Sequence, residues 1–135
     1  MPHPPPLLFE KPVSGGEGAR TLGRWGEDKV AEDLLRRGWT VVERNYRCRM
    51  GEIDIIAEDD RYLIFVEVKL RKNGQYGAAC EAVTLAKQRR LRTTAEYYLL
   101  SHPTHIQPRF DVAEVYAPQG VRTETPDIYY IENAF

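Results

Sequence analysis

Residues 51–70 of this chain read GEIDIIAEDDRYLIFVEVKL. Two largely apolar runs flank an acidic turn at residues 58–60. Apolar and β-branched runs on either side of a polar turn predict two neighbouring strands, here over residues 52–57 and 62–70. Asp54 interrupts the apolar part of the first run and Glu67 interrupts the second, each in a place where an apolar residue would be expected.

The second of these strands is predicted to have two apolar faces. Alternation with a period of two puts one set of side chains above the sheet and the other below it. The two sets are Leu63, Phe65, Glu67 and Lys69, and Tyr62, Ile64, Val66 and Val68. A strand of this kind usually lies in the middle of its sheet with both sides covered, so we expect Glu67 to be at least partly desolvated.

The segments on either side complete an α/β sandwich. Apolar spacing predicts a helix, three strands in a meander, a second helix and two further strands. Their expected spans are 21–37, 40–46, 52–57, 62–70, about 81–100, 110–116 and 128–131. Gly38 is expected to end the first helix. The predicted fold class is therefore α/β, with a central β-sheet flanked by helices.

The bulk composition bounds the type of protein. A length of 135 residues with 42% hydrophobic content fits one domain, which we place at residues 19–135 behind a Pro- and Gly-rich flexible arm at residues 1–18. No apolar stretch approaches the ~20 residues of a membrane helix, so we expect no membrane partner and a cytoplasmic location. Cys48 and Cys80 are expected to be free thiols, and zinc is not expected.

Each predicted helix carries one polar residue on its inward stripe. The first stripe is Glu27, Ala31, Leu34 and Leu35, and the second is Thr84, Gln88, Leu91, Ala95, Tyr98 and Leu99. An ionised carboxylate on an apolar face costs several kcal/mol unless a cation or donor meets it. Glu27 is therefore expected to have a partner, and Gln88 is the polar exception on the second helix.

Hairpin geometry should bring Asp54 beside Glu67, Val68 and Lys69, because only residues 55–66 separate them. Hard oxygen ligands suit Mg²⁺ or Mn²⁺, which bind one or two carboxylates and keep waters for substrate phosphate oxygens. Such an ion would act on a phosphodiester, while Lys69 orients or helps deprotonate the attacking water. Glu27 and the Val68 carbonyl are expected to complete the metal shell.

Each of these residues also has a structural interpretation. A Glu and a Lys two apart on a strand often form an ion pair, an Asp after a Gly-Glu turn often caps it, and Gln88 is equally an ordinary helix residue. The joint pattern favours a catalytic role over a structural one, because a buried charge cluster destabilises the fold unless it serves a function.

Basic residues gather over residues 69–92, although the net charge of the chain is only -1. Seven basic residues face a single acid there, Glu81. Such a segment can bind phosphate backbones or can simply be a solvated face. Besides Lys69, the basic residues are Arg71, Lys72, Lys87, Arg89, Arg90 and Arg92, which we predict to contact nucleic acid.

The pattern of Asp54 followed by Glu67-Val68-Lys69 resembles the PD-(D/E)XK nuclease superfamily, although Ile53 stands where the name has proline. Longer blocks resemble the YraN-like bacterial family, which is related to archaeal Holliday junction resolvases. They are GRWGEDKVAEDLLRRGW, ERNYRCRMGEIDIIAED, FVEVKLRKNGQYG, KQRRLRTTAEYYL, RFDVAEVY and IENAF. The resemblance implies a restriction-endonuclease-like sandwich with a mixed sheet and a three-stranded meander.

The same resemblance implies a role for each matching residue. Asp54 and Glu67 match the metal-binding acids, Lys69 the catalytic lysine, Glu27 the helix-borne acid and Gln88 a polar position beside the site. The leading hypothesis is thus a metal-dependent DNA endonuclease, selective for branched DNA in its resolvase version. The alternatives are a nucleic-acid-binding protein that hydrolyses nothing and a scaffold. A homodimer would favour the resolvase version, because paired cuts need two matched sites.

Overall fold

The computed structural model describes residues 17–72 and 83–135 as five strands, two α-helices and a short 3-10 helix. Cys80 and most of the predicted arm lie outside these residues. In chain order the elements are α2 (Glu17–Arg36), β1 (Thr40–Cys48), β2 (Gly51–Glu58), β3 (Tyr62–Arg71), α4 (Leu85–Ser101), β4 (Gln107–Tyr116), η1 (Gly120–Arg122) and β5 (Asp127–Ile131). This order confirms the predicted sequence of helices and strands, to which η1 is an addition.

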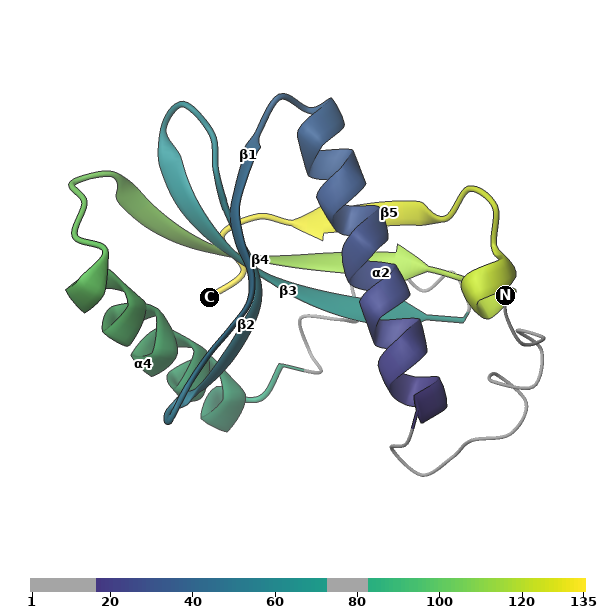
Figure 1. The fold of residues 1–135 in the computed structure, drawn as a ribbon, viewed down its shortest axis with the longest axis horizontal. Helices are drawn as coiled ribbons and strands as arrows, with labels where there is room; N and C mark the ends of the chain where they lie inside the picture. Colours follow the sequence, from purple (N-terminus) through teal and green to yellow (C-terminus); the bar gives the residue numbers. More distant parts are fainter. Residues whose placement is uncertain (1–16, 73–82) are drawn as a thin grey trace.

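The five strands form one mixed sheet in the order β1-β2-β3-β4-β5. β1, β2 and β3 pair antiparallel as a meander, whereas β3 and β4 pair parallel. A parallel pair needs a crossover, and α4 lies in the connection between the two strands. β3 is thus the central strand, as its two apolar faces predicted (Figure 1).

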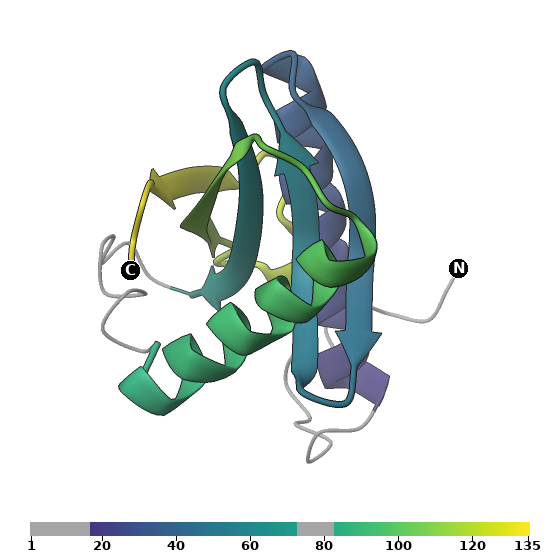
Figure 2. The same cartoon turned by 90° about the vertical axis from the view of Figure 1, so that its left-hand side faces the viewer.

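The two helices cover opposite faces of the sheet, so the molecule is a three-layer sandwich (Figure 2). The α2 side buries Val30 and Leu34 against Ile64, and the α4 side buries Leu91 and Tyr98 against the opposite face. The members of the α4 cluster on the sheet include Ile53, Ile56, Leu63, Phe65, Phe110 and Val112. This architecture confirms the predicted α/β sandwich with a central mixed sheet.

Two glycines shape the packing of α2. Gly26 is buried, and a Cβ there would lie 3.0 Å from Leu70 Cδ2, so the helix can approach β3 closely only without a side chain. Gly38 has φ +87, a backbone conformation that glycine adopts without strain. The adjacent Trp39 N–H donates to the Leu34 carbonyl at 3.0 Å and closes the end of the helix.

The structure corrects three details of the predicted helices. α2 begins at Glu17, two residues inside the predicted arm. Leu35, predicted to face inward, is 59% exposed because Leu34 and Ala31 fill the inward stripe. Thr84 lies on no helical stripe; it is the N-cap of α4, and its hydroxyl accepts from the Lys87 N–H at 3.2 Å. Among the described residues, no helix is both long and apolar enough to cross a membrane.

Candidate active site

The candidate site lies where β2 and β3 separate. Their ladder ends at the pair Ile55 and Val66. Beyond it, the Val68 N–H donates to Asp54 Oδ2 at 2.9 Å, so a carboxylate takes the place of a backbone acceptor. Ile53 packs on the α4 side although Ile55, two residues away, packs on the α2 side. The alternation of β2 therefore breaks at Asp54, which directs this side chain into the gap between the strands.

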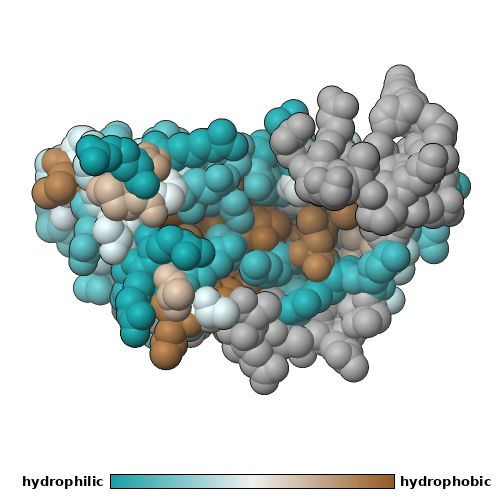
Figure 3. Space-filling model, turned by 90° about the horizontal axis from the view of Figure 1, so that it is seen from below, coloured by the Kyte–Doolittle hydropathy of each residue, from teal (hydrophilic) through white to brown (hydrophobic). Residues whose placement is uncertain are grey.

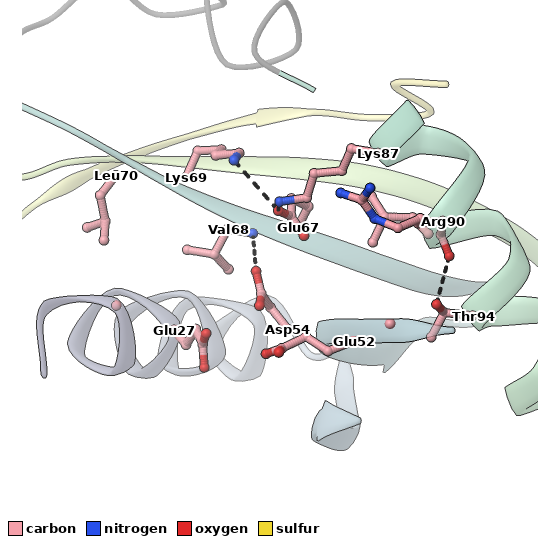
Figure 4. A pocket seen from close by; sticks show the side chains of 13 residues that line it. Glu27, Glu52, Asp54, Glu67, Val68, Lys69, Leu70, Lys87, Arg90 and Thr94 are labelled. Carbon is pink, nitrogen blue, oxygen red and sulfur yellow. Dashed lines mark hydrogen bonds and ion pairs between the residues drawn. The ribbon is translucent and has the colours of Figure 1, made fainter. Parts of the chain in front are cut away.

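A cleft of about 420 Å³ opens at this separation. Viewed from below, the hollowed centre of the face carries apolar side chains with hydrophilic ones around them (Figure 3). Residues from α2, β2, β3 and α4 line the cleft, so it joins all three layers (Figure 4). The lining residues are Gly23, Glu27, Gly51, Glu52, Asp54, Glu67, Val68, Lys69, Leu70, Lys87, Arg90, Leu91 and Thr94.

Asp54 is held in an environment that disfavours its charge. Burial and the negative charge of Glu67 raise its pKa from 3.8 to about 8, although the Val68 N–H acts in the opposite direction. Glu27 and Glu52 add smaller upward contributions. A carboxylate with so strongly raised a pKa in a cleft is typical of a functional site.

Glu67 is buried at the side of the cleft and contacts two lysines. Lys87 Nζ lies 2.7 Å from its Oε2, and Lys69 Nζ lies 3.8 Å from the same oxygen. The two lysines come from different elements, α4 and β3, and meet over one carboxylate (Figure 4). The closer ion pair is therefore with Lys87, and Lys69 is not needed as the main partner of Glu67.

The pKa values of the two lysines move in opposite directions. Burial, followed by the positive charge of Lys87, lowers the pKa of Lys69. Burial also acts to lower the pKa of Lys87, but its hydrogen bond to Glu67 and the charge of that carboxylate raise it overall. Lys87 is thus the permanent cation of the pair, and Lys69 is the more readily deprotonated amine.

Glu27 reaches the cleft from α2, as its place on the inward stripe predicted. The Asn45 side-chain amide donates to its Oε1 at 2.8 Å. Asn45 itself has φ 52 in the middle of β1, a left-handed conformation that asparagine tolerates better than most residues. The partner expected for Glu27 is therefore a neutral amide on the neighbouring strand.

The structure does not bring Gln88 into the cleft. Its Nε2 donates to the Val83 carbonyl at 3.0 Å, beside the start of α4. This contact matches the structural interpretation of Gln88. The other predicted catalytic residues, Asp54, Glu67, Lys69 and Glu27, all line the cleft.

The residues of the predicted basic segment differ in their surroundings. Lys87 and Arg90 line the cleft, and Lys72 and Arg89 are exposed. Arg71 instead donates from Nε to the buried Glu114 at 3.0 Å. The guanidinium carbon of Arg92 lies 5.1 Å from the ring centre of Phe110 and 5.6 Å from that of Phe135. Arg71 and Arg92 thus already have partners within the fold.

Sequence reasoning missed the cleft residues Glu52 and Thr94, and also Asn45, which contacts Glu27. Glu52 lies two residues before Asp54, and this i, i+2 spacing on a strand was the available signal. Thr94 lies three residues after Leu91 and four before Tyr98, so helical spacing was its available signal. Asn45 gave none, because a left-handed residue within a strand follows no periodic pattern. Thr94 is fully buried, and its hydroxyl donates to the Arg90 carbonyl at 2.7 Å.

The donor set fits a cation that needs few protein ligands. Within residues 17–72 and 83–135, no three His, Cys, Asp or Glu side chains lie close enough together to hold a metal ion jointly. Mg²⁺ and Mn²⁺ usually take one or two carboxylates and complete their shell with water and phosphate oxygens. The mutual repulsion that raises the pKa of Asp54 is also what a divalent cation would relieve.

Comparison with known sequences assigns the chain to a family. The sequence model of "Uncharacterised protein family UPF0102" matches residues 26–115. The chain belongs to family UPF0102. This match confirms the resemblance to the YraN-like family. It also spans every cleft residue from Glu27 to Thr94, so the cleft lies within the segment that characterises UPF0102.

Similar bacterial proteins match over most of their length. A UPF0102 protein of Caldicellulosiruptor saccharolyticus is 44% identical over 117 residues, which cover 86% of this chain and 98% of the relative. One from Clostridium acetobutylicum is 44% identical over 118 residues, 86% of this chain and 94% of the relative. One from Symbiobacterium thermophilum is 49% identical over 98 residues, 72% and 83% of the two chains.

Proposed function

We propose that this UPF0102 chain is a metal-dependent nuclease that acts on DNA. Membership of the family implies no activity by itself, so the proposal rests on the cleft. The observation that carries it is the cleft that holds Asp54 and Glu67 beside two lysines, where burial and the charge of Glu67 together raise the pKa of Asp54 to about 8. Two carboxylates and an amine in one cleft are what phosphodiester hydrolysis with Mg²⁺ or Mn²⁺ requires.

Asp54 and Glu67 would hold the ion, with the Val68 carbonyl as a further ligand; Glu27, which is hydrogen-bonded to Asn45, would have to move to join them. When bound, the ion would polarise the phosphodiester and lower the pKa of a water molecule. The Val68 N–H keeps the Asp54 carboxylate oriented between the strands. Lys69 is placed to orient the attacking water or accept its proton, because the lowered pKa of its amine increases the neutral fraction.

The sequence pattern and the fold add support from a different direction. Asp54 followed by Glu67-Val68-Lys69 on adjacent strands of a mixed α/β sandwich is the arrangement of PD-(D/E)XK nucleases. The related resolvases act on branched DNA, so four-way junctions are the first substrate to test. We also propose that the protein works in the cytoplasm and, in the resolvase version, as a homodimer.

A second candidate is a nucleic-acid-binding protein without hydrolytic activity. The contact that favours it is the 2.7 Å ion pair between Lys87 and Glu67, which neutralises one of the two acids without any metal. In that case the cleft would bind phosphate through its cations alone. The two candidates differ in whether the carboxylates must be free to bind a divalent ion.

Cleavage assays with defined DNA structures test the proposal. Purified protein is incubated with Mg²⁺ or Mn²⁺ and with duplex, single-stranded, flap and four-way-junction DNA, beside Asp54→Asn protein as the matched control. We expect wild-type protein to cut at least one structure and the variant to cut none. DNA binding by both proteins without cleavage of any structure would favour the second candidate.

A further inference from the structure

A second hollow continues the cleft on its α2 and β1 side. It measures about 170 Å³, and it shares Gly23, Glu27 and Glu52 with the cleft. Its remaining lining residues are Arg24, Asn45 and Arg47, so we name it the arginine hollow. The carboxylates Glu27 and Glu52 thus form the boundary between the two spaces, with arginines beyond them.

The two arginines reach the hollow from different elements. Arg24 lies on α2, three residues before Glu27, and Arg47 lies on β1, two residues after Asn45. Arg24 is exposed, and the Arg47 side chain is 73% exposed. The only ion pair of Arg47 among the described residues is with Glu52 at 3.6 Å, and the side chain of Glu52 is itself 46% exposed. Exposed pairs of this kind contribute little, so Arg47 can exchange Glu52 for a stronger anion.

β1 is irregular where it lines this hollow. Asn45 holds φ 52 within the strand, and its amide occupies Glu27 Oε1. A non-glycine residue in a left-handed conformation persists only where the surrounding structure fixes it, and such positions gather at functional sites.

Charge is therefore arranged in three zones along the combined groove. Lys87 and Arg90 lie at the α4 end, and Arg24 and Arg47 at the other. The acids lie between the two basic ends; they are Glu27, Glu52, Asp54 and Glu67. A strand whose reacting phosphodiester lies at the acids must extend toward both ends, and guanidinium groups can bind phosphate with two parallel hydrogen bonds.

We propose that Arg24 and Arg47 form a phosphate-binding site for the DNA backbone that flanks the reacting phosphodiester. This inference rests on the proposed function, because it takes DNA as the ligand of the cleft. The strand then crosses the groove from α4, over Asp54 and Glu67, to the junction of α2 and β1. The predicted basic segment at residues 69–92 supplies one end of this path only.

Salt-dependent DNA binding tests the site. Binding is measured by fluorescence anisotropy with short labelled single-stranded and duplex DNA in magnesium, on a Lys69→Ala parent that retains the carboxylates. Arg24→Gln/Arg47→Gln should weaken binding roughly tenfold or more. It should also reduce the slope of log affinity against log salt by about 1.4 to 1.8, the value for two lost phosphate contacts.

Three further variants keep the result interpretable. Arg61→Gln/Arg122→Gln removes two exposed arginines that line neither the cleft nor the arginine hollow, and it should keep the parent slope. Arg24→Lys/Arg47→Lys retains both charges and should also keep the slope of the parent protein. Glu52→Gln releases Arg47 and should tighten binding.

The possible outcomes separate the two proposals. Equal slopes for the Arg24→Gln/Arg47→Gln protein and the Arg61→Gln/Arg122→Gln protein overturn the site, even where wild-type protein cleaves DNA. Single-stranded and duplex DNA report which form of the backbone the groove accepts. If the parent binds neither form and wild-type protein cleaves nothing, the proposed function fails together with the inference.

Discussion

Lys69 and Lys87 face the same carboxylate, yet their positions give them different roles. Lys87 Nζ is 2.7 Å from Glu67 Oε2, and Lys69 Nζ is 3.8 Å from it. An ion pair at the shorter distance dominates the Coulomb interaction with a buried acid. Glu67 therefore keeps a partner when Lys69 is removed, which separates the chemical role of Lys69 from the stability of the site.

Lys69→Ala should accordingly impair turnover much more than folding. Removal of one positioned acid-base or electrostatic group generally costs ~100-fold to 10,000-fold in rate. Single-turnover cleavage measures this loss, and thermal unfolding without metal should show only a small change. Lys87→Ala is the matched control, and it should destabilise the metal-free protein more than Lys69→Ala does. A destabilised Lys69→Ala protein with near-normal cleavage would contradict the catalytic assignment.

Asp54 should make the metal-free protein less stable as the pH rises. Its pKa is about 8 in the folded protein against 3.8 as the ordinary value, so the folded state retains a proton that the unfolded state has lost. Between these two pH values the free energy of unfolding should fall by up to about 1.4 kcal/mol per pH unit. Below pH 4 the full stabilisation is present, and above pH 8 it is gone.

Urea unfolding with a chelator, from pH 5 to 9, measures this dependence. Asp54→Asn cannot titrate at that position, so the variant should lose this part of the slope and be at least as stable as wild type near pH 8. Parallel pH profiles for the two proteins would show that Asp54 titrates normally in the folded state.

At the scale of the elements, β1 and β2 are irregular at facing positions. Asn45 in β1 is left-handed, and the alternation of β2 breaks beside it at Asp54. The register of the two strands continues through this point, with Arg44 opposite Ile55 and Tyr46 opposite Ile53. The two irregularities therefore lie opposite each other in the ladder, beside the cleft that Asp54 lines.

Asn45 variants separate the backbone conformation from the hydrogen bond. Asn45→Gly keeps the left-handed conformation without strain and loses only the amide contact with Glu27. Asn45→Ala loses the contact and keeps a Cβ on a left-handed residue without the polar side chain that lets asparagine tolerate it, which costs about 1 to 2 kcal/mol relative to glycine. Chemical denaturation should therefore rank Asn45→Gly above Asn45→Ala. Equal stabilities would mean that β1 relaxes to a regular strand.

The sequence predicted elements well where periodic patterns define them. The two apolar faces of β3 placed it in the centre of the sheet, and residues 62–70 were predicted for a strand observed as Tyr62–Arg71. The prediction was less accurate at helix caps and at irregular residues. Thr84 caps the start of a helix that periodicity alone placed from about residue 81. Leu35 follows the helical spacing, although tertiary packing leaves it exposed.

At the scale of the whole molecule, the candidate site depends on contacts between elements that are far apart in sequence. Asp54, Glu67 and Lys69 could be predicted together because a hairpin brings their strands side by side. The contact of Lys87 with Glu67 requires the crossover helix to return over the sheet, and Asn45 meets Glu27 across two layers. Such contacts have no local sequence signal, so Lys87 was predicted as a nucleic-acid contact and not as the partner of Glu67.

The whole fold should respond to a divalent cation, because an ion that binds only the folded state stabilises it by mass action. Burial and the negative charge of Glu67 raise the pKa of Asp54, and a bound cation would offset both effects. At a hundredfold excess over the dissociation constant, Mn²⁺ should raise the free energy of unfolding by about 2.7 kcal/mol. The melting temperature should rise with Mn²⁺ concentration for wild type and stay constant for Asp54→Asn.

Glu124→Gln, which removes an exposed acid outside the cleft, should behave as wild type. Equal shifts for wild type and Asp54→Asn would place the ion elsewhere, and a much lower melting temperature of metal-free Asp54→Asn protein would instead favour a structural role for the charge cluster.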